Sequence, residues 1–189
     1  MMNDYLENIF YIPLLHLSVR DWENKKKILL EVIKNNPIKP SDDENILTNY
    51  HQHKGDLNET IEHLFEEEIK SFCECFGFVY YRVSMSWFQI AEKGHHHGVH
   101  NHGSTGYSSV CYLEYDEDVH TPTEFIAPFN NFITGEGLYH SPKVSEGSII
   151  FFPSNLMHFT DINKSDKKRV IISFNIDVRE SHDQRPRYS

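Results

Sequence analysis

The sequence has few cysteines, and it has no long hydrophobic run. Its 189 residues include three cysteines, Cys73, Cys75 and Cys111, an odd number that offers no paired framework. We therefore expect no structural disulfides and a reducing, cytoplasmic environment. No segment reaches the roughly 20 apolar residues that a membrane span requires. The first ten residues carry acids at Asp4 and Glu7 rather than a basic region, so we expect no secretion signal.

Basic residues are also scarce compared with acidic ones. The chain has 18 Lys and Arg against 28 Asp and Glu, a formal net charge of −10. A surface of this sign repels phosphate backbones and anionic lipids. We therefore expect neither nucleic acid nor a membrane as a partner.

The chain is rich in large apolar groups, with 13 Phe, 10 Tyr and 2 Trp. This composition favours a packed interior over disorder. The length, and the lack of internal repeats and of a long linker, predict a single domain over residues 1–189. Within it, residues 1–76 should form a strand and two supporting helices, and residues 77–180 a β-rich core.

The pattern of residues 1–76 is mainly helical. The apolar run Ile9–Leu17 is interrupted by Pro13, which indicates an edge strand. A helix is predicted from Trp22 to Ile33 with Asp21 as a possible N-cap, and residues 37–55 read as a loop. A second helix should begin at Asn58 and end at Gly77, with one buried apolar stripe.

After Gly77 the pattern changes to short β-type runs separated by turn residues. The predicted strands are Phe78–Ile90, Gly98–His102, Tyr107–Tyr115, Thr123–Ile126, Ser148–Phe152 and Arg169–Val178. About eight strands in a hundred residues are typical of an antiparallel jelly roll. The predicted fold class is therefore β-rich α+β, a cupin-like double-stranded β-helix with N-terminal supporting helices.

The sequence contains 13 histidines, and two of them have the spacing of a metal site. His100 and His102 are two residues apart in a predicted strand, so their side chains should share one face about 6.6 Å apart at the backbone. Two imidazoles in that position can bind one ion. Within the triplet His95–His97, we interpret His95 and His97 as part of a solvated, glycine-flanked loop, and no role is predicted for the three histidines.

Two later residues extend this pattern. His158 follows the apolar strand that ends at Phe152, where a barrel places groups at its mouth. Arg169 begins the last predicted strand. It either continues the exposed lysine cluster before it or points into the barrel, where its guanidinium could hold a carboxylate.

Together these residues resemble the iron(II)- and 2-oxoglutarate-dependent oxygenases, whose signature is His-x-Asp/Glu, then a distant His, then an Arg or Lys. Here 55 residues separate His102 from His158, and ten separate His158 from Arg169. The segment is most similar to the small prolyl-hydroxylase-like oxygenases. The resemblance implies Fe(II) and 2-oxoglutarate as cofactors. It also implies hydroxylation of a peptide, amino acid or other small molecule by molecular oxygen, with 2-oxoglutarate decarboxylated to succinate.

The resemblance also implies roles for individual residues. His100 and His158 take the two histidine ligand positions, and Arg169 pairs with the distal carboxylate of 2-oxoglutarate. Tyr112 matches the tyrosine that shares this carboxylate. Ser173 matches a frequent hydroxyl position, and Gln89 is a candidate for the other end of the cosubstrate.

One position departs from the family pattern, because His102 stands where an aspartate or glutamate is usual. Three interpretations remain open. The site is a three-histidine iron centre, or a carboxylate such as Glu114 or Asp116 completes it, or it binds metal without the oxygenase reaction. The alternative functions are a three-histidine dioxygenase of the thiol-dioxygenase kind and a non-catalytic jelly-roll module. The substrate and the oligomeric state are not predicted.

Overall fold

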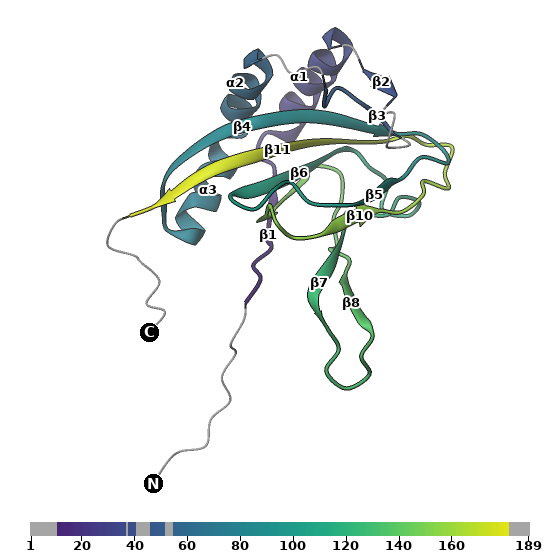
Figure 1. The fold of residues 1–189 in the computed structure, drawn as a ribbon. Coiled ribbons are helices and arrows are strands. Elements are labelled where there is room, and N and C mark those ends of the chain that lie inside the picture. Colours follow the sequence, from purple (N-terminus) through teal and green to yellow (C-terminus); the bar gives the residue numbers. More distant parts are fainter. Residues whose placement is uncertain (1–10, 37, 41–45, 52–54, 182–189) are drawn as a thin grey trace.

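The computed structural model describes residues 11–36, 38–40, 46–51 and 55–181. Three helices precede most of the strands: α1 (Trp22–Asn35), α2 (Gly55–Leu64) and α3 (Glu66–Phe76). Figure 1 shows α1 and α2 beside the long strand formed by residues 78–91. None of the helices in these ranges is long and apolar enough to cross a membrane.

The strands form two antiparallel sheets. The larger one contains β1 (Leu15–Ser18), β2 (Lys39–Pro40), β3 (Leu47–Thr48), β4 (Phe78–Ala91), β6 (Tyr107–Glu114), β9 (Ser148–Pro153) and β11 (Arg169–Glu180). Their order is β1-β9-β6-β11-β4-β3-β2. The smaller sheet contains β5 (His97–His100), β7 (Glu124–Asn130), β8 (Gly137–His140) and β10 (His158–Thr160), in the order β5-β10-β7-β8.

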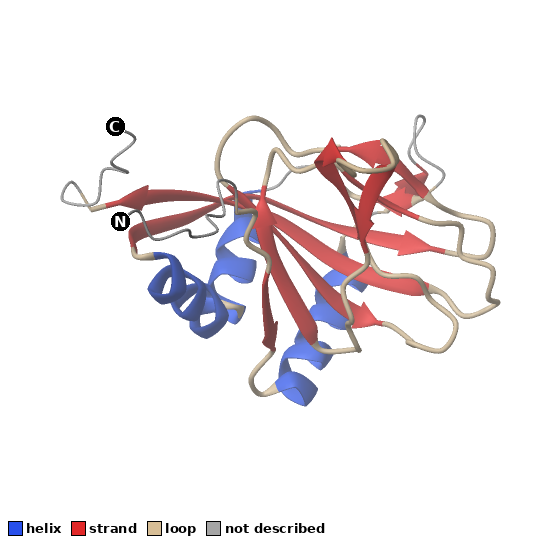
Figure 2. Ribbon diagram, turned by 90° about the horizontal axis from the view of Figure 1, so that it is seen from below, coloured by secondary structure: helices blue, strands red, loops and turns tan. Residues whose placement is uncertain are grey.

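The two faces of the larger sheet bury different side chains. On β11, Val170, Ile172 and Phe174 pack in the main core together with the buried faces of the helices. Figure 2 shows the helices gathered on this side of the sheet. Ile171, which lies between them in sequence, belongs to a second core cluster with Phe125 of the smaller sheet. This alternation follows from the period of two along a strand. It places the helices against one face of the larger sheet and the smaller sheet against the other face.

This architecture confirms the predicted β-rich jelly roll with N-terminal helices. The edge position of the first strand is confirmed as well, because β1 ends the order of the larger sheet. The start of that predicted strand at Ile9 lies outside the described residues, and Pro13 precedes β1.

The helices differ from the prediction in two details. Asp21 precedes α1 with φ 50°, but its side chain does not cap the helix and instead accepts hydrogen bonds from Asn24 Nδ2. The predicted second helix is two helices, because the chain turns at the buried Phe65 between α2 and α3. Asn58 therefore lies within α2, where its side chain bonds to Ser86 Oγ instead of capping.

Several predicted loops contain strands. Residues 37–55 include β2 and β3, which extend the larger sheet beyond β4. The predicted strand Thr123–Ile126 is longer, and it pairs with β8 in a hairpin that projects from the body of the molecule (Figure 1). A short strand, β10, follows Met157. Each of these strands is short or exposed, so its hydrophobic alternation is weak.

Candidate metal centre

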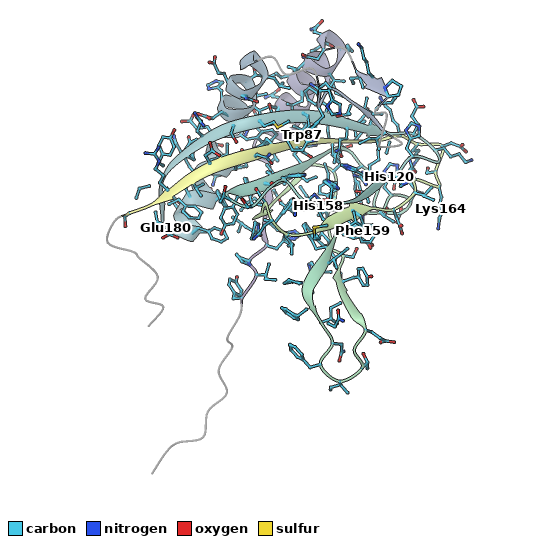
Figure 3. The ribbon with its side chains drawn as sticks, viewed as in Figure 1. Trp87, His120, His158, Phe159, Lys164 and Glu180 are labelled. Carbon is cyan, nitrogen blue, oxygen red and sulfur yellow. The ribbon has the colours of Figure 1, made fainter. Side chains whose placement is uncertain are left out.

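The structure brings together three of the 13 histidines, His100, His102 and His158. Their potential ligand nitrogens all lie within 4.8 Å of one another, and His158 is buried whereas the other two are half-buried. They come from the end of β5, the residues just after it, and the start of β10. Figure 3 shows His158 pointing into the space between the sheets.

Backbone pairing creates this cluster from distant parts of the sequence. His158 and His100 are direct partners in the antiparallel pair β10–β5. His102 lies beyond the end of β5, so the predicted strand alternation does not place it. Instead its N–H donates to the Ser154 carbonyl oxygen at 2.8 Å, which ties this segment to the turn before β10.

Hydrogen bonds orient the imidazole rings toward one another. The Nδ1 atoms of His100 and His158 each lie 2.8 Å from a backbone carbonyl oxygen, that of Gly98 and that of Leu156. A carbonyl oxygen only accepts, so in each ring Nδ1 carries the hydrogen and Nε2 presents a lone pair. His102 Nδ1 lies 2.8 Å from Ser108 Oγ, and its Nε2 lies 3.3 Å from His100 Nε2. Metal-bound histidines have this form, in which the far nitrogen bonds to the protein.

His158 is held in the neutral form that binds metal. Burial lowers its pKa to about 2, with contributions from the neighbouring His100 and His102. A neutral imidazole keeps its lone pair across the physiological range. His158 therefore has the charge state that a divalent transition metal requires of a histidine ligand.

His97 is a correction to the predicted solvated loop, because its ring is buried. It stacks on His100, with ring centroids 3.8 Å apart, and its Nδ1 lies 3.1 Å from Gln89 Nε2. Since the Gln89 amide nitrogen donates, His97 Nδ1 accepts. Gln89, predicted to contact the cosubstrate, thus lies beside the histidines with its amide on His97.

Arg169 points into the interior and does not continue the exposed lysine cluster. It is 4% exposed, and its terminal nitrogens donate to the Thr121 carbonyl oxygen and to Thr160 Oγ1, both at 3.2 Å. Its Nε has no hydrogen-bond partner, and no described carboxylate forms an ion pair with it. Burial lowers the pKa of this guanidinium, but arginine stays charged in proteins. A buried cation without an anionic partner is costly, so this position favours an anionic ligand.

Tyr112 and Ser173 are also buried on the inner face of the larger sheet. The Tyr112 hydroxyl accepts a hydrogen bond from the Thr123 N–H at 3.1 Å, which leaves its own hydrogen for a carboxylate oxygen. Burial raises the pKa of Tyr112, opposed by this hydrogen bond and by the charge of Arg169. Ser173 lines a small cavity together with the three histidines.

Glu114 and Asp116, the carboxylates considered as further ligands, do not join the histidine cluster in the structure. Glu114 forms an ion pair with Lys168 at 2.9 Å, and Asp116 forms one with Lys167. Among the residues that the structure describes, the metal-type cluster contains only the three histidines. A carboxylate from these positions would first have to leave its lysine.

Two small cavities near Arg169 and the histidines share part of their lining. One is lined by Arg169 and the other by the three histidines, and Gln89, His97 and Thr160 line both. Each has a volume of about 10 Å³, the space of about one water molecule. Side chains between the sheets therefore have to move to admit a larger ligand.

Comparison with known proteins agrees with this geometry. Residues 85–175, which contain the histidines and Arg169, match the family described as "Putative 2OG-Fe(II) oxygenase". This segment is therefore similar to the 2OG-Fe(II) oxygenases, the resemblance that the sequence indicated. The cofactors of the family are iron(II) and 2-oxoglutarate, as predicted. No curated protein of similar sequence was found.

Several solved structures share the fold of this chain. A collagen prolyl hydroxylase of Paramecium bursaria Chlorella virus-1, in complex with 2-oxoglutarate, is 16% identical with a TM-score of 0.59, over 86% of this chain and 94% of that one. A Pseudomonas putida prolyl-4-hydroxylase is 11% identical with a TM-score of 0.57, over 89% and 92%. HygX of Streptomyces hygroscopicus, with nickel, 2-oxoglutarate and hygromycin B bound, is 10% identical with a TM-score of 0.63, over 86% and 82%.

The sequence reasoning missed the residues that surround the histidines. Ser108 contacts His102, and Thr160 lies between Arg169 and the histidine cluster. A signal for Ser108 was present, because it alternates with Val110 and Tyr112 on one face of β6. Thr160 had no such signal, since β10 has only three residues.

Proposed function

We propose that this chain is an oxygenase in which His100, His102 and His158 hold iron(II), and Arg169 with Tyr112 holds the distal carboxylate of 2-oxoglutarate. When bound, the iron and 2-oxoglutarate supply oxidation of a substrate by molecular oxygen, with release of carbon dioxide and succinate. We further propose that the substrate is hydroxylated.

The observation that carries the proposal is the combination of the histidine cluster with the buried Arg169. Three imidazoles present nitrogens to one another, and two of them are fixed by carbonyl oxygens in the metal-binding form. Beyond Gln89 and His97 lies a buried guanidinium whose Nε has no partner. A dicarboxylate with a chelating keto-acid end matches both features: one end binds metal, and the other needs a cation.

The residues of the chain have separate tasks in this proposal. Arg169 and the Tyr112 hydroxyl bind and orient one carboxylate, and the three histidines leave the remaining coordination positions open. Phe152 packs against His158, with ring centroids 5.0 Å apart, and it limits access of water to that side. The protein contributes placement and a dry surrounding rather than an acid or base.

An anaerobic titration tests the proposal. Iron(II) followed by 2-oxoglutarate should produce the weak visible charge-transfer band of the chelate, and admission of oxygen should release succinate. Iron binding without the band would favour a three-histidine dioxygenase that does not use 2-oxoglutarate. Absence of iron binding would favour a non-catalytic module.

The structural relatives guide the first choice of substrates. Two of them are prolyl hydroxylases, whereas HygX has hygromycin B bound. We propose prolyl peptides as the first substrates, followed by free amino acids and other small molecules. Succinate release that depends on the added compound identifies the substrate class.

A further inference from the structure

Ser108 connects His102 to the larger sheet through three hydrogen bonds. It lies on β6 and is fully buried. Its Oγ lies 2.8 Å from His102 Nδ1, 2.8 Å from Ser154 Oγ and 2.9 Å from Asn175 Oδ1. A serine hydroxyl has one hydrogen to donate and two lone pairs to accept, so these three bonds use its full capacity.

Counting hydrogens determines the direction of each bond. Asn175 Oδ1 only accepts, so the single Ser108 hydrogen goes to it. The other two neighbours must then donate to Ser108. The Ser154 hydroxyl is one donor, and the Nδ1–H of His102 is the other. His102 therefore presents the lone pair of Nε2 toward His100 and His158. Its 3.3 Å contact with His100 Nε2 then brings two lone pairs together, and a cation bound by both nitrogens relieves their repulsion.

This arrangement differs from that of the other two histidines. His100 and His158 bond through Nδ1 to backbone carbonyl oxygens, which can only accept and which no substitution removes. A hydroxyl can either donate to an imidazole nitrogen or accept from it. At His102, the position where the family usually has a carboxylate, the tautomer thus depends on Asn175 directing the Ser108 hydrogen.

We propose that Ser108 and Asn175 are positioning residues that fix His102 in its metal-binding tautomer. The inference rests on the proposed function, because it assumes that His102 Nε2 binds the metal. Without Ser108, Nδ1–H loses its acceptor, and the hydrogen can move to Nε2. Without Asn175, the Ser108 hydroxyl is free to donate to Nδ1, which also places the hydrogen on Nε2.

The tautomer can be measured directly in the metal-free protein. Nitrogen-15 NMR distinguishes a protonated imidazole nitrogen from one with a lone pair, and His102→Gln assigns the signals. We expect the wild-type protein to show Nδ1–H at His102. Ser108→Ala should give a mixture or the Nε2–H form, with His100 and His158 unchanged. The same Nδ1–H signal in Ser108→Ala would overturn the proposal.

A cobalt(II) titration followed by visible absorption gives a second measurement. Loss of an outer-shell partner typically weakens metal binding about 10–100-fold, and we expect this for Ser108→Ala. Ser109→Ala is the matched control, because Ser109 is the next residue on β6, is equally buried, and has an Oγ without a hydrogen-bond partner in the structure. Equal cobalt affinity of Ser108→Ala and the control would overturn the proposal.

Two substitutions at Asn175 test the same inference if Ser108→Ala does not fold. Asn175→Asp keeps an oxygen that accepts the Ser108 hydrogen, so His102 should keep Nδ1–H. Asn175→Ala removes this acceptor and should populate Nε2–H. Identical tautomers in the two variants would refute the role of Asn175.

The two measurements separate failure of the inference from failure of the proposed function. A wild-type protein that takes up no cobalt(II) or iron(II) would contradict the metal site, whatever the tautomer of His102. A wild-type protein that binds metal, with Ser108→Ala equal to it in both tautomer and affinity, would contradict only the positioning role.

Discussion

The ring of His97 stacks on the ring of His100 with centroids 3.8 Å apart and planes inclined by 26°. His97 also accepts a hydrogen bond from Gln89, which lies on β4 of the other sheet. The stack and the hydrogen bond therefore connect β5 of the smaller sheet to the larger one. His97 supports the position of His100 without belonging to the three-histidine cluster.

Replacing His97 with Ala should destabilise the protein more than it weakens metal binding. The change leaves a cavity and an unpaired Gln89 amide, so the free energy of unfolding in urea should fall by about 1–3 kcal/mol. His100 keeps its bond to the Gly98 carbonyl oxygen. Cobalt(II) affinity should therefore fall by less than about tenfold. Loss of a residue that bonds directly to a metal ligand typically lowers metal affinity by about 10–100-fold.

His95→Ala is the control for this prediction. His95 lies in the same segment and bonds through Nδ1 to the Glu92 N–H in an exposed position. We expect little change in stability and none in metal affinity. A loss of cobalt(II) binding in His97→Ala as large as that in His100→Ala would instead identify His97 as a ligand.

The sequence allowed prediction of the elements with strong periodicity and of the residues that those elements carry. The alternation along β11 predicted that Arg169 and Ser173 share a face with Ile171, and the structure buries all three on the inner side. The last helix was predicted from its apolar periodicity, and its end was predicted from Gly77. In the structure Gly77 follows the helix with φ 74°, a left-handed conformation that glycine adopts readily.

Other features depend on contacts between distant segments and leave no local pattern. His97 is buried because Gln89 and His100 surround it, although its neighbours in sequence are glycine and histidine. The buried acceptor of the Arg20 N–H, Glu68, sits in an ordinary charged helix segment and forms an ion pair with Lys25. Tertiary packing decides such positions, so sequence periodicity does not show them.

The stability of the metal-free protein should fall as the pH decreases below about 6.5. In the unfolded chain His158 titrates near 6.5, whereas burial lowers its folded pKa to about 2. Between these values the unfolded state binds the extra proton, so His158 costs up to about 1.4 kcal/mol of folding free energy for each pH unit. Above about pH 6.5 His158 is neutral in both the folded and the unfolded state, so it causes no loss of stability there.

Urea unfolding in the presence of a chelator, at several pH values from 7.5 to 5, measures this effect. His158→Leu lacks the titrating ring and should show a shallower decrease than the wild-type protein, because the other histidines are common to both. Parallel curves for the two proteins would show that His158 does not stay neutral in the folded state.

Arg169→Ala should weaken binding of 2-oxoglutarate far more than binding of iron. Removing one partner of a buried, hydrogen-bonded charge pair typically costs 2 kcal/mol or more, which corresponds to an increase in Kd of about 30-fold or greater. Iron affinity should change less than about threefold, because the three imidazoles and their Nδ1 bonds remain. Anaerobic titration of the iron-loaded protein, followed by the charge-transfer band, measures the first value.

Lys168→Ala is the matched control for Arg169→Ala. Lys168 precedes Arg169 and carries the same charge, but its side chain is exposed and pairs with Glu114. Surface ion pairs contribute little, so 2-oxoglutarate affinity should remain near that of the wild-type protein. Equal affinities of wild type and Arg169→Ala would remove Arg169 from the proposed site.

His102→Asp tests whether residue 102 is a ligand position. The substitution restores the two-histidine, one-carboxylate set that the family usually carries and places a negative charge beside the cation. We expect tighter iron(II) binding, by roughly tenfold, measured anaerobically by competition with a chromophoric chelator. Asn101→Asp adds the same charge at the neighbouring residue, which is exposed and bonds to Met157 Sδ, so it controls for general electrostatic attraction. Equal gains in both variants would mean that residue 102 attracts iron only through charge, whereas a gain confined to His102→Asp would mean that its side chain binds the metal.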